Sequence, residues 1–281
     1  MNILDISLYA LIAANALITY KGFNDRSFFS DNTFSISGIL VHKQYKRIIS
    51  SGFLHVDWTH LLFNMFALFS FGQLLLQLVG PIQFFIIYFV SLVGGSLLSL
   101  FINRKKSYYS AVGASGAVSG VIFACIAIYP QVGIYFFFIP IEIPGWVFGP
   151  AFILISIFGM KRQSDNIGHD AHLGGAIIGM LITVLLHPYL LKENILVIVG
   201  ILVPTILFLI YMIKKPAVSK WVKAREHNYE NLSIDDKYNA KRADKKAEID
   251  RILDKANAKG WENLSPEEVA TLNAYADKHK L

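Results

Sequence analysis

Two pairs of polar residues in this sequence could catalyse acyl transfer. Ser115 is a potential nucleophile and His172 a potential general base. His60 and Asn64 are four residues apart, and neutral imidazole and carboxamide groups donate the hydrogen bonds that stabilise an oxyanion. All four lie in or at the ends of long apolar runs, where polar groups are costly unless they have partners. The sequence therefore predicts an active site within a membrane.

The composition is that of a membrane protein. Apolar residues make up 54% of the chain and charged residues only 16%, and the mean hydropathy is +0.47. Of the 46 charged residues, 27 follow Ile213. We therefore expect an all-α polytopic membrane protein with a charged, soluble C-terminal segment. The net charge of +6 suits a membrane surface, and basic and aromatic residues do not alternate as in a nucleic-acid groove, so we expect no nucleic-acid partner.

Seven apolar runs are candidates for membrane spans, which need about 20 residues each. They are Ile3–Tyr20, His60–Val79, Ile82–Ile102, Ser115–Pro130, Trp146–Met160, Ala171–His187 and Ile195–Ile213. The first has no basic segment before it and no small-residue cleavage site, which favours a retained helix over a signal peptide. We predict three parts: a six-span core (residues 1–190), an additional span (191–213) and a helical tail (214–281).

The connecting segments also have patterns. Residues 21–59 are too polar to cross a membrane but rich in apolar side chains, so we expect them to lie at the membrane interface. Prolines exclude a helix from residues 133–144, which we expect to re-enter or line the membrane. In the tail, Ser265-Pro266-Glu267-Glu268 forms a capping box that predicts a helix to about His279. Ile249, Ile252, Leu253 and Ala256 predict a second apolar helix face.

Ser115 is expected at a helix N-terminus below the membrane surface. Its span, Ser115–Pro130, would be about 24 Å long at 1.5 Å per residue, whereas the hydrocarbon core is about 30 Å thick. The irregular residues before it, 107–113, are tolerated at that depth only beside protein or a water-filled cavity. Backbone amides at the helix start could then stabilise an oxyanion formed by attack of Ser115.

Glycines at helical spacing can bring Ser115 and His172 together. Gly116 and Gly120 form one small-residue pair, and Gly175 and Gly179 form another on the face that carries His172. These glycines can serve helix packing alone, but packing along this face also assembles a Ser–His pair. His169 lies largely off that face and Asp170 faces elsewhere, so we expect a dyad with His172 as the base.

Alternatives to this interpretation are open at this stage. Taken alone, His60 and Asn64 are typical of interhelical hydrogen bonding. A metal site from His55, His60, His169 and His172 is conceivable, but no HExxH motif or cysteine ligand set supports it. Ala117 replaces the last glycine of a GxSxG elbow, which argues against a soluble hydrolase. A transporter would need paired broken helices, and only one short span is present.

These motifs resemble those of the rhomboid intramembrane serine proteases. The matching residues are His55 just before the second span with His60 and Asn64 in it, Gly113-Ala114-Ser115-Gly116 at the start of the fourth, and Ala171-His172-Leu173-Gly174-Gly175 with Gly179 in the sixth. The resemblance implies Ser115 as nucleophile and His172 as general base and acid. It implies an oxyanion hole formed by His60, Asn64 and the Ser115 amide. His55, Gly113, Gly116, Gly175, Gly179 and His169 are expected to support the site, and no metal or cofactor is required.

The resemblance has two departures. Arg47 is where the family's Trp-Arg loop motif has its arginine, but Lys46 replaces the tryptophan. Ser119 stands one turn after the nucleophile, where some members have a tyrosine stacked on the histidine. A seventh span after a six-helix core resembles the 6+1 arrangement of the family, and the ILDK…LSPEE pattern of the tail resembles an appendage on some bacterial rhomboids.

The resemblance implies an endopeptidase that cleaves transmembrane or juxtamembrane segments of single-span proteins, located in a bacterial inner membrane. Its expected partners are those transmembrane substrates and the lipid bilayer. The alternative is a pseudoprotease that binds and escorts membrane proteins without cleavage. Orientation has two conflicting indications. Ten basic residues lie on the Ser115 side against Lys192 on the other, which favours a cytoplasmic site, whereas the resemblance implies a site facing away from the cytoplasm.

Overall fold

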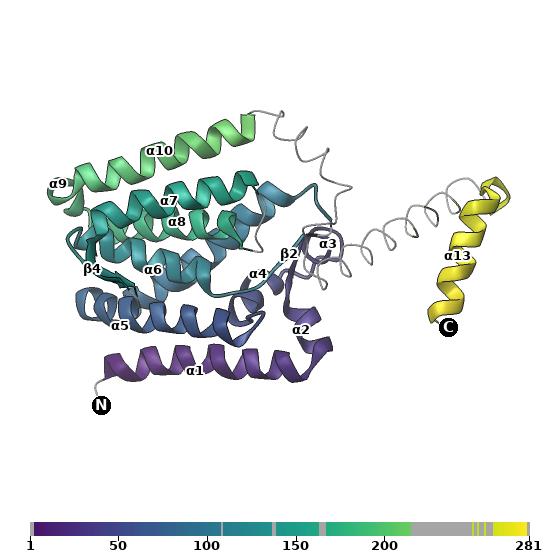
Figure 1. Cartoon of the computed structure of the whole chain (residues 1–281), viewed down its shortest axis with the longest axis horizontal. Helices are drawn as coiled ribbons and strands as arrows, with labels where there is room; N and C mark the ends of the chain where they lie inside the picture. Colours follow the sequence, from purple (N-terminus) through teal and green to yellow (C-terminus); the bar gives the residue numbers. More distant parts are fainter. Residues whose placement is uncertain are drawn as a thin grey trace. The chain divides into compact units, whose positions relative to one another are not determined.

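The structure, a computed structural model, describes residues 3–107, 109–136, 139–162, 167–214 and 261–279 and the single positions 249, 252 and 256. The chain forms two compact units, Met1–Trp221 and Val222–Leu281. Figure 1 shows that the first unit is a bundle of helices. Its long helices are α1 (Ile3–Asn24), α5 (Trp58–Asn103), α6 (Ser115–Ile128), α7 (Gly145–Arg162), α8 (His169–Leu186) and α10 (Ile195–Lys214).

The predicted all-α membrane fold is confirmed. All seven apolar runs are helical through most of their length, and in the described residues four helices, α1, α5, α8 and α10, are long and apolar enough to cross a membrane. The apolar parts of α6 and α7 are shorter, and α6 has only 14 residues. The short fourth helix that the sequence predicted at Ser115 is therefore present.

Two predicted spans are joined in α5, which has 46 residues. Gly80 interrupts it with φ 76° and ψ 171°, in a region that glycine adopts without a side-chain penalty. Pro81 follows, where its missing N–H is tolerated because a helical segment starts there. A side chain on Gly72 would lie 3.4 Å from the Phe84 ring, so the two segments pack together across the break.

The segment between α1 and α5 is more structured than the sequence indicated. It contains α2 (Arg26–Asn32), β1 (Phe34–Ser35), α3 (Ile36–Leu40), α4 (Arg47–Ser50) and the 3-10 helix η1 (Ser51–Phe53). The buried Arg47 holds it together: Nη1 donates to the Ser30 and Thr33 carbonyls at 2.5 and 2.8 Å. Strand β1 pairs antiparallel with β2 (Ser110–Ala111), which fixes the segment before Ser115.

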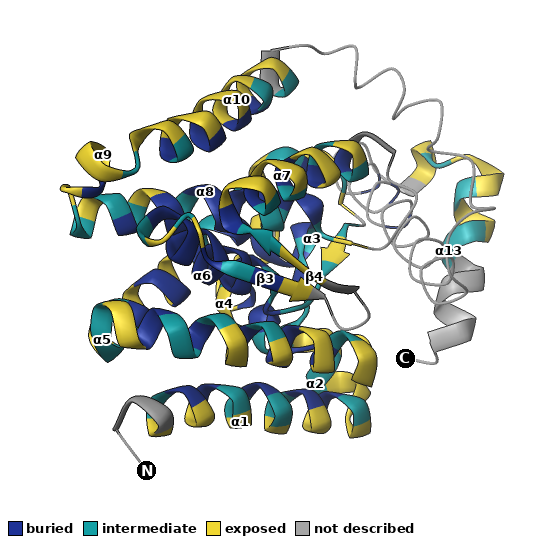
Figure 2. Cartoon of the chain, turned by 60° about the vertical axis from the view of Figure 1, so that its left-hand side comes forward, coloured by how far each residue is buried: buried dark blue, intermediate teal, exposed yellow. Residues whose placement is uncertain are grey.

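Helix α6 is the centre of the first unit and packs against both α5 and α8. Every residue from Gly116 to Ala127 is buried, as the dark blue of α6 in Figure 2 shows, whereas α1 and α10 expose apolar outer faces. A helix that is buried on all sides has no need of a polar face, which explains the unbroken apolar sequence after Ser115.

The opposite end of the bundle contains a hairpin and a turn of helix. Strands β3 (Gly133–Phe136) and β4 (Ile139–Pro144) are antiparallel, so the prediction that this segment is not helical holds, although the strands were not predicted. After α9 (Leu190–Glu193), the Asn194 amide donates to the carbonyls of Ala127 and Ile128 at 3.0 and 3.1 Å. It thereby satisfies carbonyls at the C-terminus of α6 and joins α6 to the start of α10.

The second unit contains the 3-10 helix η3 (Trp261–Asn263) and α13 (Pro266–His279). The predicted capping box is present: the Ser265 N–H donates to Glu268 Oε2 at 2.8 Å, and the Glu268 N–H donates to Ser265 Oγ at 3.2 Å. Ile249, Ile252 and Ala256 are helical and buried, as the predicted stripe requires, and Leu253 lies outside the described residues.

Candidate active site

Close contact between α6 and α8 creates the site. A Cβ on Gly175 would lie 1.9 Å from the Gly116 carbonyl oxygen, and one on Gly179 would lie 2.4 Å from the Cα of Gly120. Only glycine allows the two backbones to approach this closely. The predicted packing of the two glycine pairs is therefore confirmed.

This packing places Ser115 beside His172. Ser115 Oγ and His172 Nε2 are 2.7 Å apart, within hydrogen-bonding distance. Ser115 is the first residue of α6, and the N–H groups of the first helical turn have no partner within the helix. The nucleophile and base expected from the sequence thus meet next to backbone donors, although their catalytic roles stay predictions.

His60 lies near the start of α5 and faces Gly113, and Asn64 follows one turn later on the same helix. A Cβ on Gly113 would lie 2.9 Å from His60 Nε2 and 3.7 Å from Ser115 Oγ, so His60 and Ser115 flank Gly113. Gly113 has φ 134°, which side chains rarely adopt. Asn64 Nδ2 donates to the His60 carbonyl at 2.9 Å, and the same nitrogen carries a second N–H.

His55 supports the segment before Ser115. Thr19 Oγ1 on α1 donates its one proton to the Phe53 carbonyl at 3.0 Å. The same oxygen must therefore accept the hydrogen bond from His55 Nδ1, which lies 2.9 Å away. Nε2 then carries a lone pair, which faces the Ala114 N–H at 3.5 Å. Burial and the neighbouring His60 lower the pKa of His55 to about 3, so the ring is neutral and can accept this contact.

The surroundings of His172 include an aromatic ring although Ser119 replaces the family's stacking tyrosine. Ser119, at the position of the stacking tyrosine, donates to the Ser115 carbonyl at 2.7 Å. Phe152 on α7 lies beside His172, with ring centres 6.0 Å apart and planes inclined by 32°. His169 is buried against α7, where a Cβ on Gly159 would lie 2.0 Å from its Nε2, so it does not replace His172 beside Ser115.

Asp170 belongs to a buried network of polar side chains from α5 and the segment before Ser115. Its carboxylate accepts from Ser99 Oγ at 3.0 Å, from Tyr109 at 3.2 Å and from the Asn103 amide. Burial and the carboxylate raise the pKa of Tyr109, which keeps its hydroxyl a donor. The network ties the first turn of α8 to α5 and to the segment before Ser115, so it holds His172 in place indirectly.

Sequence reasoning missed Thr19, Ser99, Asn103, Tyr109 and Phe152. Ser99 and Asn103 carried a usable signal, because they are polar, four residues apart and at the end of an apolar run, as are His60 and Asn64. Phe152 carried none, because the sequence has 21 phenylalanines.

The four histidines considered for a metal site form two separate pairs. His55 and His60 have ring centres 4.9 Å apart, and His169 and His172 have centres 5.9 Å apart. Within the described ranges, no group of three or more His, Cys, Asp or Glu side chains is placed to hold a metal ion.

Fold and site together define a polytopic helical membrane protein with a serine–histidine pair at the N-terminus of a central helix. Residues 42–189 match the Rhomboid domain, more than half of the chain, and the chain belongs to the rhomboid family. Residues 232–278 match DUF6576, a family of unknown function, which covers much of the charged tail.

Relatives agree with this assignment. The mitochondrial Rhomboid protein 1 of Saccharomyces cerevisiae is 35% identical over 137 residues, 48% of this chain and 40% of the relative. The mitochondrial RHOMBOID-like protein 12 of Arabidopsis thaliana is 29% identical over 195 residues, 63% of this chain and 57% of the relative. The candidate rhomboid protease YdcA of Bacillus subtilis is 30% identical over 146 residues, half of this chain and 67% of the relative. The chain thus spans about half the length of the two mitochondrial relatives.

Proposed function

We propose that this protein is an intramembrane serine endopeptidase that uses a Ser115–His172 dyad. The observation that carries the proposal is the 2.7 Å separation of Ser115 Oγ and His172 Nε2 at the N-terminus of α6. A hydroxyl beside a histidine nitrogen is the arrangement that activates a serine nucleophile. Membership of the rhomboid family and the similarity to YdcA support the same activity.

The chemistry follows from the geometry. His172 Nε2 takes the proton of Ser115 as Oγ bonds to the scissile carbonyl carbon, and the carbonyl electrons move to the oxygen. His172 then gives the proton to the leaving amine as the C–N bond breaks, which leaves an acyl-enzyme. A water molecule, deprotonated by His172, attacks the ester carbon; the bond from that carbon to Ser115 Oγ breaks, His172 returns the proton to Oγ, and the carboxylic acid leaves.

The oxyanion is proposed to bind the Ser115 N–H, the Asn64 amide and His60. Charge develops in a region of low dielectric constant, where such hydrogen bonds are stronger than in water. A substrate helix must unwind before it can be cut, because its amides are hydrogen-bonded within the helix. We therefore propose single-span membrane proteins with small or helix-breaking residues near the cleaved bond as the substrate class.

The test compares purified full-length protein with Ser115→Ala and His172→Ala on a panel of single-span substrates, together with fluorophosphonate labelling. We expect both variants to lose cleavage and Ser115→Ala to lose labelling. Ser119→Ala is the matched serine control, one turn away on the same helix, and His187→Ala is the matched histidine control at the other end of α8. Cleavage that survives in Ser115→Ala would refute the proposal.

A rhomboid pseudoprotease that escorts membrane proteins is the second candidate function. Ser115 and His172 are both present and within hydrogen-bonding distance, which favours the protease. Fluorophosphonate labelling of wild type without cleavage of any substrate in the panel would favour the escort function. We propose a bacterial cell membrane as the location on the strength of the Bacillus relative, although the other relatives named above are mitochondrial.

A further inference from the structure

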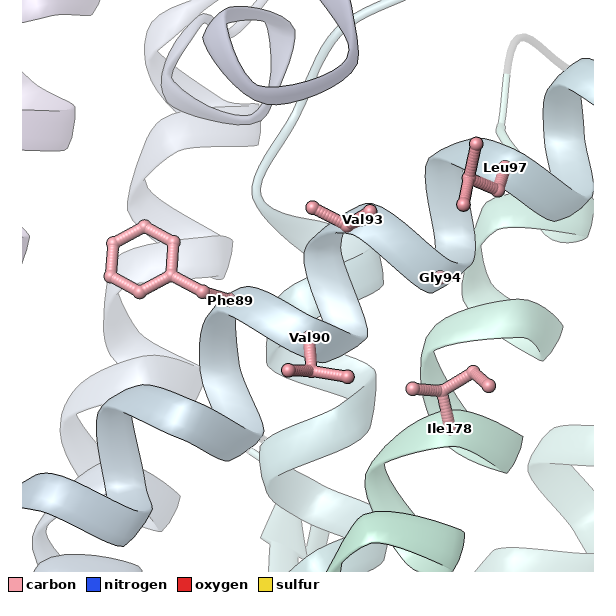
Figure 3. A pocket seen from close by; sticks show the side chains of 6 residues that line it. All are labelled: Phe89, Val90, Val93, Gly94, Leu97 and Ile178. Carbon is pink, nitrogen blue, oxygen red and sulfur yellow. The ribbon is translucent and has the colours of Figure 1, made fainter.

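An apolar groove lies between the second segment of α5 and α8, and neither Ser115 nor His172 lines it (Figure 3). Its volume is about 430 Å³. Its lining residues are Phe89, Val90, Val93, Gly94, Leu97 and Ile178. At its floor a Cβ on Gly94 would lie 2.6 Å from Ile178 Cγ1, so the glycine lets α8 approach.

The apolar face continues from the groove to a basic end. Phe101 and Arg104 follow Leu97 by four and seven residues, which places all three on one face of α5. The Arg104 guanidinium carbon lies 4.1 Å from the centre of the exposed Phe101 ring, and Nη1 donates to the Phe101 carbonyl at 2.6 Å. Lys105 is exposed beside it. A fixed cationic group therefore stands where the helix leaves the membrane.

We propose that this groove binds one acyl chain of an anionic phospholipid, whose phosphate contacts Arg104 and Lys105. From Val90 to Arg104 the helix rises roughly 21 Å, at 1.5 Å per residue, so the apolar and basic parts are spaced along the membrane normal as they are in a lipid. Guanidinium groups bind phosphate oxygens through charge-assisted hydrogen bonds, and basic residues at the membrane surface attract anionic lipids.

Charge favours a lipid over a protein helix. A second helix would have no reason to place an anionic group at Arg104. A phospholipid presents its phosphate at that end.

The test measures lipid binding by native mass spectrometry of the full chain in a neutral detergent. Phosphatidylglycerol and phosphatidylcholine with identical acyl chains are the probes. We expect wild type to prefer phosphatidylglycerol. The double variant Arg104→Gln/Lys105→Gln should bind it about thirty-fold more weakly, because each basic residue at the membrane surface strengthens binding roughly five- to sixfold. Lys43→Gln/Lys46→Gln removes the same charge from exposed positions in the segment between α1 and α5 and should keep the preference.

A second pair of variants tests the groove itself. Val90→Trp should weaken both lipids because it fills the groove, and Leu207→Trp on the exposed face of α10 should weaken neither. Thermal unfolding in the same detergent verifies that each variant is folded. A photoreactive residue at position 97 should capture phosphatidylglycerol. Equal affinity of wild type for both lipids, an equal loss in the Lys43/Lys46 variant, or capture of a protein helix at position 97 would overturn the proposal.

Discussion

The contact between Gly175 and Gly116 offers the sharpest test of how the fold serves the site. In Gly175→Ala the new Cβ would lie 1.9 Å from the Gly116 carbonyl oxygen, and backbone atoms on both sides leave no flexible side chain to move away. Real Cβ atoms essentially never approach closer than 3.0 Å. Helices α6 and α8 must therefore separate by at least about 1 Å along this direction.

That displacement acts directly on the dyad. Ser115 is one residue from Gly116 and His172 three residues from Gly175, so a separation of about 1 Å would lengthen the 2.7 Å distance to nearly 4 Å, beyond a hydrogen bond. A misplacement of about 1 Å in a catalytic group costs on the order of a hundredfold in rate. We expect kcat/KM of Gly175→Ala to fall by about that factor, with fluorophosphonate labelling slowed in parallel.

The assay measures cleavage of a single-span substrate and the labelling rate at several probe concentrations. Gly200→Ala is the matched control, because a Cβ on that residue of α10 meets no atom within 4 Å. Thermal unfolding in the same detergent separates a folded protein with a displaced dyad from an unfolded one. A folded Gly175→Ala protein with wild-type cleavage would show that the glycine contact does not set the dyad geometry.

Three further predictions concern Asp170, His55 and the orientation of the chain in the membrane. Asp170→Asn should cost about 1–3 kcal/mol of stability, because one carboxylate oxygen is replaced by an NH2 group that cannot accept from the donors facing it. Cleavage should fall while the pH dependence of kcat stays unchanged, and a shifted pH profile would place Asp170 in contact with the dyad. The pKa of His55 is about 3 in the folded protein and near 6.5 in the unfolded chain. Between these two values the unfolded chain binds more protons than the folded protein. The free energy of unfolding should therefore have its full value above pH 6.5 and fall by up to about 1.4 kcal/mol per pH unit towards pH 3. His55→Gln should flatten that dependence in thermal unfolding at pH 4–8, and an unchanged slope would exclude His55 as its source. Reporter fusions at residue 1 and at the tail should place the N-terminus inside and the tail outside, as the family resemblance implies for seven spans; a cytoplasmic tail would instead support the charge bias.

From the sequence alone, the fold class, the long helices and the meeting of Ser115 with His172 could be predicted. Hydropathy identifies spans because every backbone polar group in lipid must be satisfied within its own helix, and this holds whatever the neighbours are. The capping box at Ser265 and the glycine pairs at Gly116 and Gly175 are also local signals, since a cap and a close-packed helix face follow from spacing alone. Periodicity even indicated that Asp170 turns away from His172.

The residues around Ser115 and His172 come from helices that lie far apart in the sequence. Phe152 reaches His172 from α7, Thr19 reaches His55 from α1, and Asn103 reaches Asp170 across 67 residues of sequence. No local pattern predicts such contacts, because they depend on how helices pack against one another and not on the conformation of any one of them. The sequence named a serine and a histidine, and the approach of α6 and α8 at their glycines set the 2.7 Å between them.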